Sequence, residues 1–128
     1  MPKQVVKTNQ APAPIGPYNQ AIIANGFVFA SGQVALVPET GELELSNIQA
    51  ETHQVMKNVQ AVLAEAKINL NHVVKTTIFL SDMSLFAQVN EVYGSYFTDQ
   101  FPARETVAVK GLPRGVNVEI SVTAVVEL

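Results

Sequence analysis

The chain of 128 residues contains no cysteine and no tryptophan. Without cysteine, disulfides, thiolate nucleophiles and cysteine-ligated metal ions are all excluded. The two histidines, His53 and His72, lie in different predicted elements, and neither has a second ligand at a metal-binding spacing. We therefore expect surface or capping roles for both histidines and no metal site.

Charged residues are also scarce. They make up 15% of the chain, against 48% hydrophobic residues, and the formal net charge is −3. This composition excludes an intrinsically disordered chain. A negative net charge offers no basic field to phosphates, so no nucleic-acid partner is expected. The apolar content exceeds what one small monomer readily hides, which favours an oligomer.

Long apolar runs are missing as well. No stretch approaches the ~18 consecutive apolar residues of a membrane span, and the first residues, MPKQVVKTNQAPAP, lack the apolar core of a signal peptide. We expect a soluble cytoplasmic protein with no membrane association. The length is typical of one domain, and no linker or repeat interrupts the chain, so residues 1–128 are predicted to form a single domain.

Hydrophobic periodicity predicts elements in the order β-β-β-α-β-α-β-β. The predicted strands are 4–7, 18–24, 27–36, 73–80, 104–110 and 116–126, and the predicted helices are 47–67 and 85–98. Asn25-Gly26 predicts a two-residue hairpin, and Ser46 or Asn47 a helix N-cap. In 27–36 the even-numbered residues are small and apolar and share one face.

These elements predict an α+β fold, in which two helices cover one face of a mixed sheet. No third helix remains to cover the other face. We therefore expect neighbouring subunits to cover it.

Two charges in the last strands raise the question of a site. We expect the strands 104–110 and 116–126 to form a hairpin around GLPRG. Matching their apolar faces places Val107 in the core and brings Arg104, Thr106 and Glu119 together on the second face, while Glu105 points the other way.

Two interpretations of Arg104 and Glu119 remain open on this pattern. The first is a cross-strand salt bridge, which contributes little if it is exposed. The second is an anion site. There the guanidinium fork of Arg104 would grip a carboxylate, and Glu119 would handle a proton or a water with a raised pKa.

Several motifs resemble those of the Rid family, the RidA-like reactive intermediate (enamine/imine) deaminases. They are APAPIGPYNQA, FASGQVAL, VVKTTIFLSDM with VNEVYGSYF, and above all FPARETVAV followed by VEI. The resemblance covers essentially the whole chain. It implies an α+β fold related to the small chorismate mutases and a homotrimer with three equivalent clefts between subunits.

The resemblance also implies an activity. Family members remove reactive metabolites by hydrolysing 2-imino and enamino acids, such as 2-aminoacrylate, to 2-keto acids and ammonia, without metal or cofactor. By motif, Arg104 matches the arginine of PAR, which binds the substrate carboxylate, and Glu119 matches the glutamate of VEI, which positions or activates water. The backbone around Thr106 would hold the substrate. Many deaminase members have cysteine at this position.

The remaining matched residues would line the cleft: Tyr18 of GPY, Ser31 and Gly32 of SGQ, and Asn90 of VNE. Without the motifs, Tyr18 reads equally well as a half-buried strand residue, and Asn90 reads better as a helix-surface amide than as a site residue. Gly32 has an alternative as a close-packing glycine.

Two other functions compete with deamination. One is a non-catalytic trimeric binder or sensor of small 2-keto or amino-derived carboxylates, which Arg104 would serve equally well. The other is the ribonuclease or translation-inhibitor behaviour reported for some relatives, which the net charge of −3 disfavours.

Overall fold

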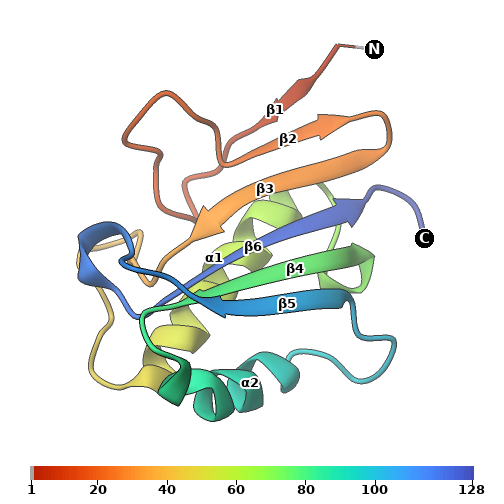
Figure 1. Ribbon diagram of the computed structural model, residues 1–128. Helices are drawn as coiled ribbons and strands as arrows, with labels where there is room; N and C mark the ends of the chain where they lie inside the picture. The colour runs from red at the N-terminus through yellow and green to blue at the C-terminus, as the bar shows by residue number, and fades with distance from the viewer. Residues whose placement is uncertain (1) are drawn as a thin grey trace.

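The computed structural model describes residues 2–128. Figure 1 shows one mixed sheet with strand order β1-β2-β3-β6-β4-β5 and two helices behind it. The strands and helices are, along the chain, β1 Gln4–Val6, β2 Ala21–Ala24, β3 Phe27–Gln33, α1 Ile48–Glu65, β4 Val73–Leu80, α2 Phe86–Gly94, β5 Ala103–Ala108 and β6 Val118–Val125. Three short 3-10 turns, η1 Leu70–His72, η2 Met83–Leu85 and η3 Pro113–Gly115, complete the chain. The predicted element order and the α+β class are confirmed.

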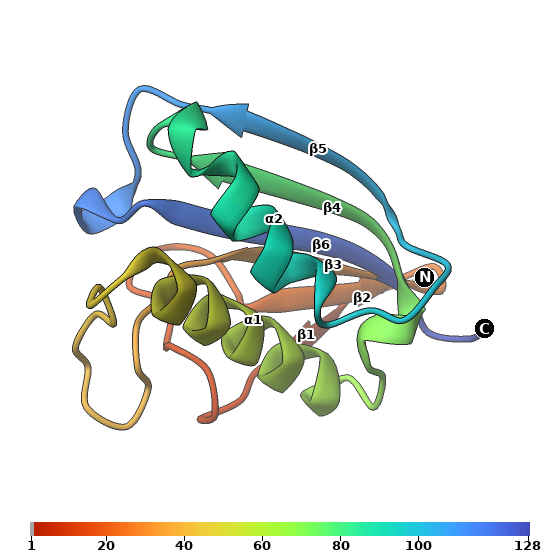
Figure 2. The ribbon, with the colours of Figure 1, turned by 90° about the horizontal axis from the view of Figure 1, so that it is seen from below.

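Both helices lie on the same face of the sheet, as predicted (Figure 2). Helix α1 packs on β3 and β6, and α2 packs on α1. The core lies between these layers. It is formed by alternate residues of β6 and one stripe of α1, which are almost fully buried: Val118, Ile120, Val122, Ala124, Val55, Met56, Val59, Val62 and Leu63.

Two local signals act as expected. Asn25 and Gly26 have φ angles of 52° and 82°, which the hairpin between β2 and β3 requires. The side-chain oxygen of Asn47 accepts a hydrogen bond from the backbone N–H of Ala50 at 2.8 Å. Asn47, rather than Ser46, is therefore the cap of α1.

Some predicted bounds were wrong. The second strand begins at Ala21, so Tyr18 lies in the preceding loop. The third strand ends at Gln33, and its pairing with β6 shifts register between Ala30 and Gln33. This irregularity reverses the alternation, so that the buried residues are the even-numbered Val28 before it and the odd-numbered Gln33 and Ala35 after it.

The predicted hairpin between the last two strands was also wrong. Strand β5 pairs in parallel with β4 at the edge of the sheet, and β4 separates it from β6. Helix α2 connects β4 to β5, and a strand–helix–strand connection of this kind normally joins parallel neighbours. The predicted element order contains this signal, and it determines the pairing of β5 despite the short GLPRG connection to β6.

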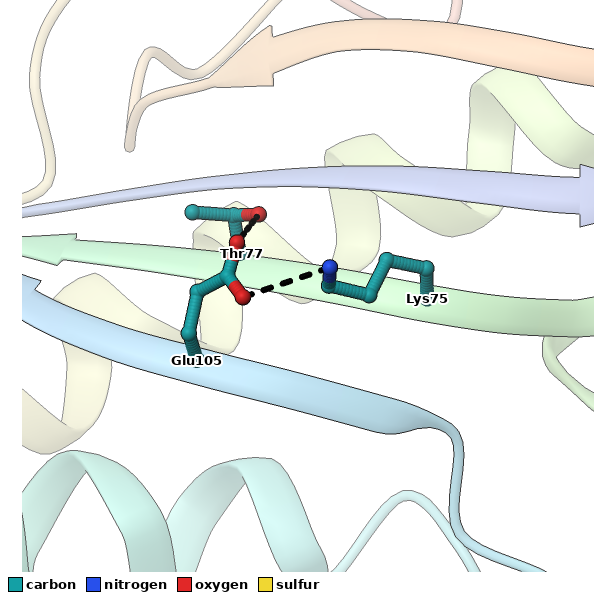
Figure 3. Close-up of polar contacts among 3 residues, drawn as sticks. All are labelled: Lys75, Thr77 and Glu105. Atoms are coloured by element: carbon teal, nitrogen blue, oxygen red, sulfur yellow. Dashed lines mark hydrogen bonds and ion pairs between the residues drawn. The ribbon is translucent and has the colours of Figure 1, made fainter.

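The parallel pairing changes which face carries Arg104. Thr106 pairs with Ile78, which pairs with the buried Ile120, so Thr106 and Arg104 lie on the helix-covered face. Glu119 pairs with Phe79 on the opposite face. Figure 3 shows the side chain of Glu105 on this opposite face, in front of the sheet, with the helices behind.

The face without helices carries exposed apolar side chains. Val5, Phe27, Phe29 and Val107 are 50%, 39%, 49% and 42% exposed, and the strand register places all four on the face of Glu119. Within residues 2–128, no helix has the length and apolar character to cross a membrane.

Candidate functional site

Arg104 is held against helix α2. Its Nη1 donates a hydrogen bond to the side-chain oxygen of Asn90. Its guanidinium carbon lies 5.4 Å from the centre of the Tyr93 ring and 5.7 Å from that of Phe86, within the range of cation–π attraction. These contacts bring the two matched residues Asn90 and Arg104 together and orient the guanidinium.

Strand β4 holds the side chain of Tyr93 in place. Its hydroxyl donates to the Thr76 hydroxyl at 2.9 Å, and burial raises the pKa of Tyr93. A tyrosine that stays neutral and hydrogen-bonded offers Arg104 a rigid aromatic wall.

Arg104 lines a hollow of about 400 Å³ between α2 and β5. The other lining residues are Asn90, Tyr93, Gly94, Phe101 and Pro102. Among residues 2–128, no carboxylate forms an ion pair with Arg104. Its donors can therefore take a carboxylate from outside the chain, in the bidentate geometry that guanidinium favours.

Thr106 follows Arg104 on the same face. Its hydroxyl oxygen is buried and has no hydrogen-bond partner within the described part of the chain. A buried hydroxyl without a partner is uncommon in folded proteins, and a bound water or ligand is one way to satisfy it.

Glu119 lies on the opposite face, directly over Gly32. A Cβ atom added to Gly32 would lie 2.3 Å from the Glu119 carboxyl oxygen Oε2, so only glycine leaves room for this side chain. Burial raises the pKa of Glu119, because desolvation disfavours the charged form. A carboxyl with a raised pKa suits proton transfer near neutral pH.

Ser31 ties the loop before β2 to this position. Its hydroxyl donates to the backbone oxygen of Asn19 at 2.6 Å, and its N–H donates to the oxygen of Gln20 at 2.9 Å. Tyr18 directly precedes Asn19 in that loop, and it is half exposed. The two hydrogen bonds of Ser31 therefore hold the part of the loop that adjoins Tyr18.

The matched residues therefore fall into two groups. The arginine group, Asn90, Arg104 and Thr106, lies on the helix-covered side of the sheet edge. The glutamate group is built around Glu119 and Gly32, with Ser31 and the Tyr18 loop beside them. The prediction that Arg104, Thr106 and Glu119 share one face was wrong, because β5 pairs with β4 and not with β6.

Several residues of the hollow were not predicted as site residues. Phe101 is 60% exposed and lines the hollow with Tyr93 and Gly94. Their signal in the sequence was weak, because Tyr93 falls on an apolar helical stripe that reads as core. Residues 2–128 contain no group of three or more His, Asp or Glu side chains that could hold a metal ion.

Comparison with known proteins gives the following similarities. A family model described as Endoribonuclease L-PSP matches residues 8–126. A mouse protein named 2-iminobutanoate/2-iminopropanoate deaminase is 44% identical, over 96% of this chain and 91% of its own. A solved structure from Yersinia pestis, described as a member of the conserved Rid protein family, is 47% identical with a TM-score of 0.94, over 97% of this chain and 99% of that one. The structure of E. coli TdcF with bound serine is 35% identical with a TM-score of 0.91, over 95% and 98% of the two chains.

Proposed function

Because this chain belongs to the Rid family, we propose that it hydrolyses 2-imino acids and their enamine tautomers, of the 2-aminoacrylate type, to 2-keto acids and ammonia. The observation that carries the proposal is the guanidinium of Arg104, which lines a hollow and forms no ion pair with a carboxylate of residues 2–128. Every 2-imino acid carries the carboxylate that this fork binds. The mouse relative is named for such a reaction, and the E. coli relative was solved with serine, a small amino acid with the same carboxylate.

In the proposed reaction, Arg104 holds the substrate carboxylate and water adds to the imine carbon. Glu119 accepts a proton from the water and passes it to the nitrogen, which gives a carbinolamine. A second proton then moves from the new hydroxyl to the nitrogen as the C–N bond breaks, which releases ammonia and leaves the 2-keto acid. One water is consumed, and no oxidant, metal or cofactor takes part. Imines hydrolyse unaided in water, so orienting substrate and water needs to supply only a few kcal/mol. Tyr18, Ser31, Gly32, Asn90 and the Thr106 backbone would line the substrate.

The proposal requires more than one chain. Arg104 and Glu119 lie on opposite faces of the sheet, so they can act on one substrate only if neighbouring chains contribute one each. We therefore include a homotrimer, with a cleft at each subunit boundary. The exposed apolar side chains of the uncovered face, among them Phe29 and Val107, support such an assembly. A cytoplasmic location, where dehydratases that depend on pyridoxal phosphate release such imines, belongs to the same proposal.

The test is an assay of imine decay. A dehydratase generates 2-aminoacrylate or 2-aminocrotonate in situ, and the loss of its absorbance is followed with and without the protein. The wild type should accelerate the decay. Arg104→Ala should lower kcat/KM by about 10–100-fold, because it removes charge-assisted hydrogen bonds. Lys110→Ala, which removes an exposed cation elsewhere, is the matched control and should behave as wild type.

Failure of the wild type to accelerate decay of either imine would contradict the proposal. The non-catalytic binder then becomes the better account, and calorimetry with a 2-keto acid tests it. Glu119→Gln separates the two functions, since a catalyst should lose turnover and keep ligand binding, whereas a binder has no turnover to lose. The family description as an endoribonuclease is tested by incubation with RNA, which the net charge of −3 disfavours as a ligand.

A further inference from the structure

Helix α1 contains a buried carboxylate that the proposed reaction does not use. Glu51 lies in the first turn of α1 and is 1% exposed. Within residues 2–128, it forms no ion pair with a lysine, arginine or histidine. The side chain therefore points into the protein, and its partners must come from hydrogen bonds.

Those partners are all at the start of β6. The oxygen Oε2 of Glu51 accepts the backbone N–H of Asn117 at 2.7 Å and of Val118 at 3.2 Å. The other oxygen, Oε1, accepts the side-chain N–H of Asn117 at 2.9 Å. One side chain of α1 thus holds two consecutive backbone amides of another element.

The held segment joins two more elements. The Asn117 side-chain oxygen accepts the Ser81 hydroxyl at 3.0 Å, and its backbone oxygen accepts the Ser81 N–H at 2.9 Å. On the other side of β6, the last pair with β3 is Gln33 with Ile120. Beyond that pair, β3 no longer holds β6, and Glu51 takes the place of a strand partner.

If stability were its only role, a buried glutamate would be an unfavourable residue at this position. A buried carboxylate without a cation must repay its desolvation by hydrogen bonds. An apolar side chain of similar volume could fill the same space, and such replacements are often neutral or stabilising. What an apolar side chain cannot provide is acceptors for the Asn117 and Val118 amides. The position next to the N-terminus of α1 also favours a negative group.

Glu119 directly follows this held segment. Val118 is fixed through its N–H, and the next side chain leaves β6 on the opposite face, over Gly32. The space at Gly32 leaves little tolerance, since even a methyl group there would overlap the carboxyl oxygen. A shift of the β6 backbone at Asn117–Val118 is therefore transmitted to the Glu119 carboxyl.

We propose that Glu51 is a positioning residue, which fixes the Asn117–Val118 backbone and thereby the place of the Glu119 carboxyl, without touching the substrate. The inference rests on the proposed function, because it acts through Glu119. Loosening this anchor should impair the proton-transfer step, while Arg104, on the other face, still binds the substrate carboxylate. The expected signature is a fall in kcat with little change in KM.

The test compares three variants in the imine-decay assay. Glu51→Met removes the acceptors at similar volume and should lower kcat by about ten-fold or more, with KM changed by less than about three-fold. Glu51→Gln keeps an acceptor oxygen and the shape, and should restore most of kcat. Thr52→Val is the matched control. This neighbour on α1 is fully buried and donates only to the Ile48 carbonyl of its own helix, so its loss should leave kcat unchanged.

A second readout does not depend on turnover. In Glu51→Met, hydrogen exchange at the Asn117 and Val118 amides should accelerate, and the carboxyl 13C NMR signal of Glu119 should shift; in Thr52→Val neither should change. Should Glu51→Met fail to fold, Asn117→Ala serves instead. It removes the Oε1 contact and should produce the same changes to a smaller degree.

The outcomes separate the two proposals. If the wild type has no imine turnover, the proposed function fails, and the NMR comparison still decides whether Glu51 places Glu119. If Glu51→Met leaves kcat and the Glu119 signal unchanged, or if Thr52→Val lowers kcat as much, Glu51 is only a structural residue and the inference is overturned.

Discussion

Arg104 stands on the helix-covered face of the edge strand β5, while Glu119 leaves β6 on the opposite face, with the whole of β4 between the two strands. A single chain therefore presents a carboxylate-binding cation and a candidate proton-transfer group to different sides of one sheet. This relationship decides how the proposed reaction can be tested.

The first prediction is complementation between inactive chains. Arg104→Ala should keep only about 1–10% of the wild-type kcat/KM, and Glu119→Gln should have little turnover alone. After the two are unfolded and refolded together, activity should return, because some clefts combine an intact Arg104 with an intact Glu119. Random mixing in a cyclic assembly restores roughly a quarter of the clefts. Recovery is measured by imine decay, and refolding each variant alone is the control. No recovery would mean that the two residues do not act from different chains.

The second prediction concerns the space over Gly32. Gly32→Ala should lower kcat by about 100-fold, because the added methyl group displaces the Glu119 carboxyl by an ångström or more. Substrate binding through Arg104 should be spared. Gly111→Ala is the control, since no atom lies within 4 Å of a Cβ added there. An active Gly32→Ala variant would show that Glu119 does not need its present position.

The third prediction is the sign of a pH effect on stability. The pKa of Glu119 is raised by burial above its ordinary value of 4.5, so the folded protein holds this proton more tightly than the unfolded chain. Stability contributed by the protonated form is present below the ordinary value and is lost as the pH rises through the raised one. The Tm of wild type minus the Tm of Glu119→Gln should therefore fall as the pH rises from 4.5 to the raised pKa of Glu119.

Glu44 provides the opposite control. Hydrogen bonds from the Ser46 hydroxyl and N–H lower the pKa of Glu44. The ionised form of Glu44 therefore stabilises the folded protein, and this stabilisation is lost as the pH falls. The Tm of wild type minus that of Glu44→Gln should rise with pH between the lowered pKa of Glu44 and its ordinary value of 4.5, a window that lies below the one of Glu119. The same sign for both variants would contradict the assignment of burial as the cause at Glu119.

The fourth prediction concerns the Thr106 hydroxyl, which has no partner in the described residues. Thr106→Val replaces the hydroxyl with a methyl group of similar shape. It should leave the free energy of unfolding unchanged or raise it by up to about 1 kcal/mol, because a buried unsatisfied group is removed. Turnover should persist if water attacks with the help of Glu119. Denaturant unfolding and imine decay check the two parts, and loss of turnover would give the hydroxyl a direct role.

The fifth prediction reports on the uncovered face of the sheet. Figure 3 shows the Glu105 carboxylate between Lys75 Nζ, at 3.2 Å, and the Thr77 hydroxyl, at 3.3 Å. Both charged side chains are about half exposed in the single chain, where Glu105→Gln should cost at most about 1 kcal/mol. If subunits cover this face, the loss should reach several kcal/mol and weaken the assembly.

Sedimentation and denaturant unfolding of Glu105→Gln distinguish the two cases. Glu91→Gln, on the exposed surface of α2, is the matched control. A small loss of stability together with an unchanged oligomeric state would show that no subunit covers this face in solution.

Local chemistry in the sequence was sufficient for much of the fold. The left-handed turn at Asn25-Gly26, the cap at Asn47 and the strand Val73–Leu80 all depend on neighbouring residues, and each was predicted correctly. Alternation also placed Ile120 in the core and Glu119 outside it. These features survive because hydrophobic periodicity and turn conformation are properties of short segments.

The order of the strands was decided only by tertiary structure. Strand β5 is an edge strand with both faces partly exposed, so its alternation does not say which face is the core. Its partner is set by the connection through α2, which places it beside β4 and turns Arg104 towards that helix. The irregularity near Gly32, the Glu51 anchor and the separation of Arg104 from Glu119 arise in the same way. They depend on contacts between residues far apart in the sequence, and no short pattern encodes such contacts.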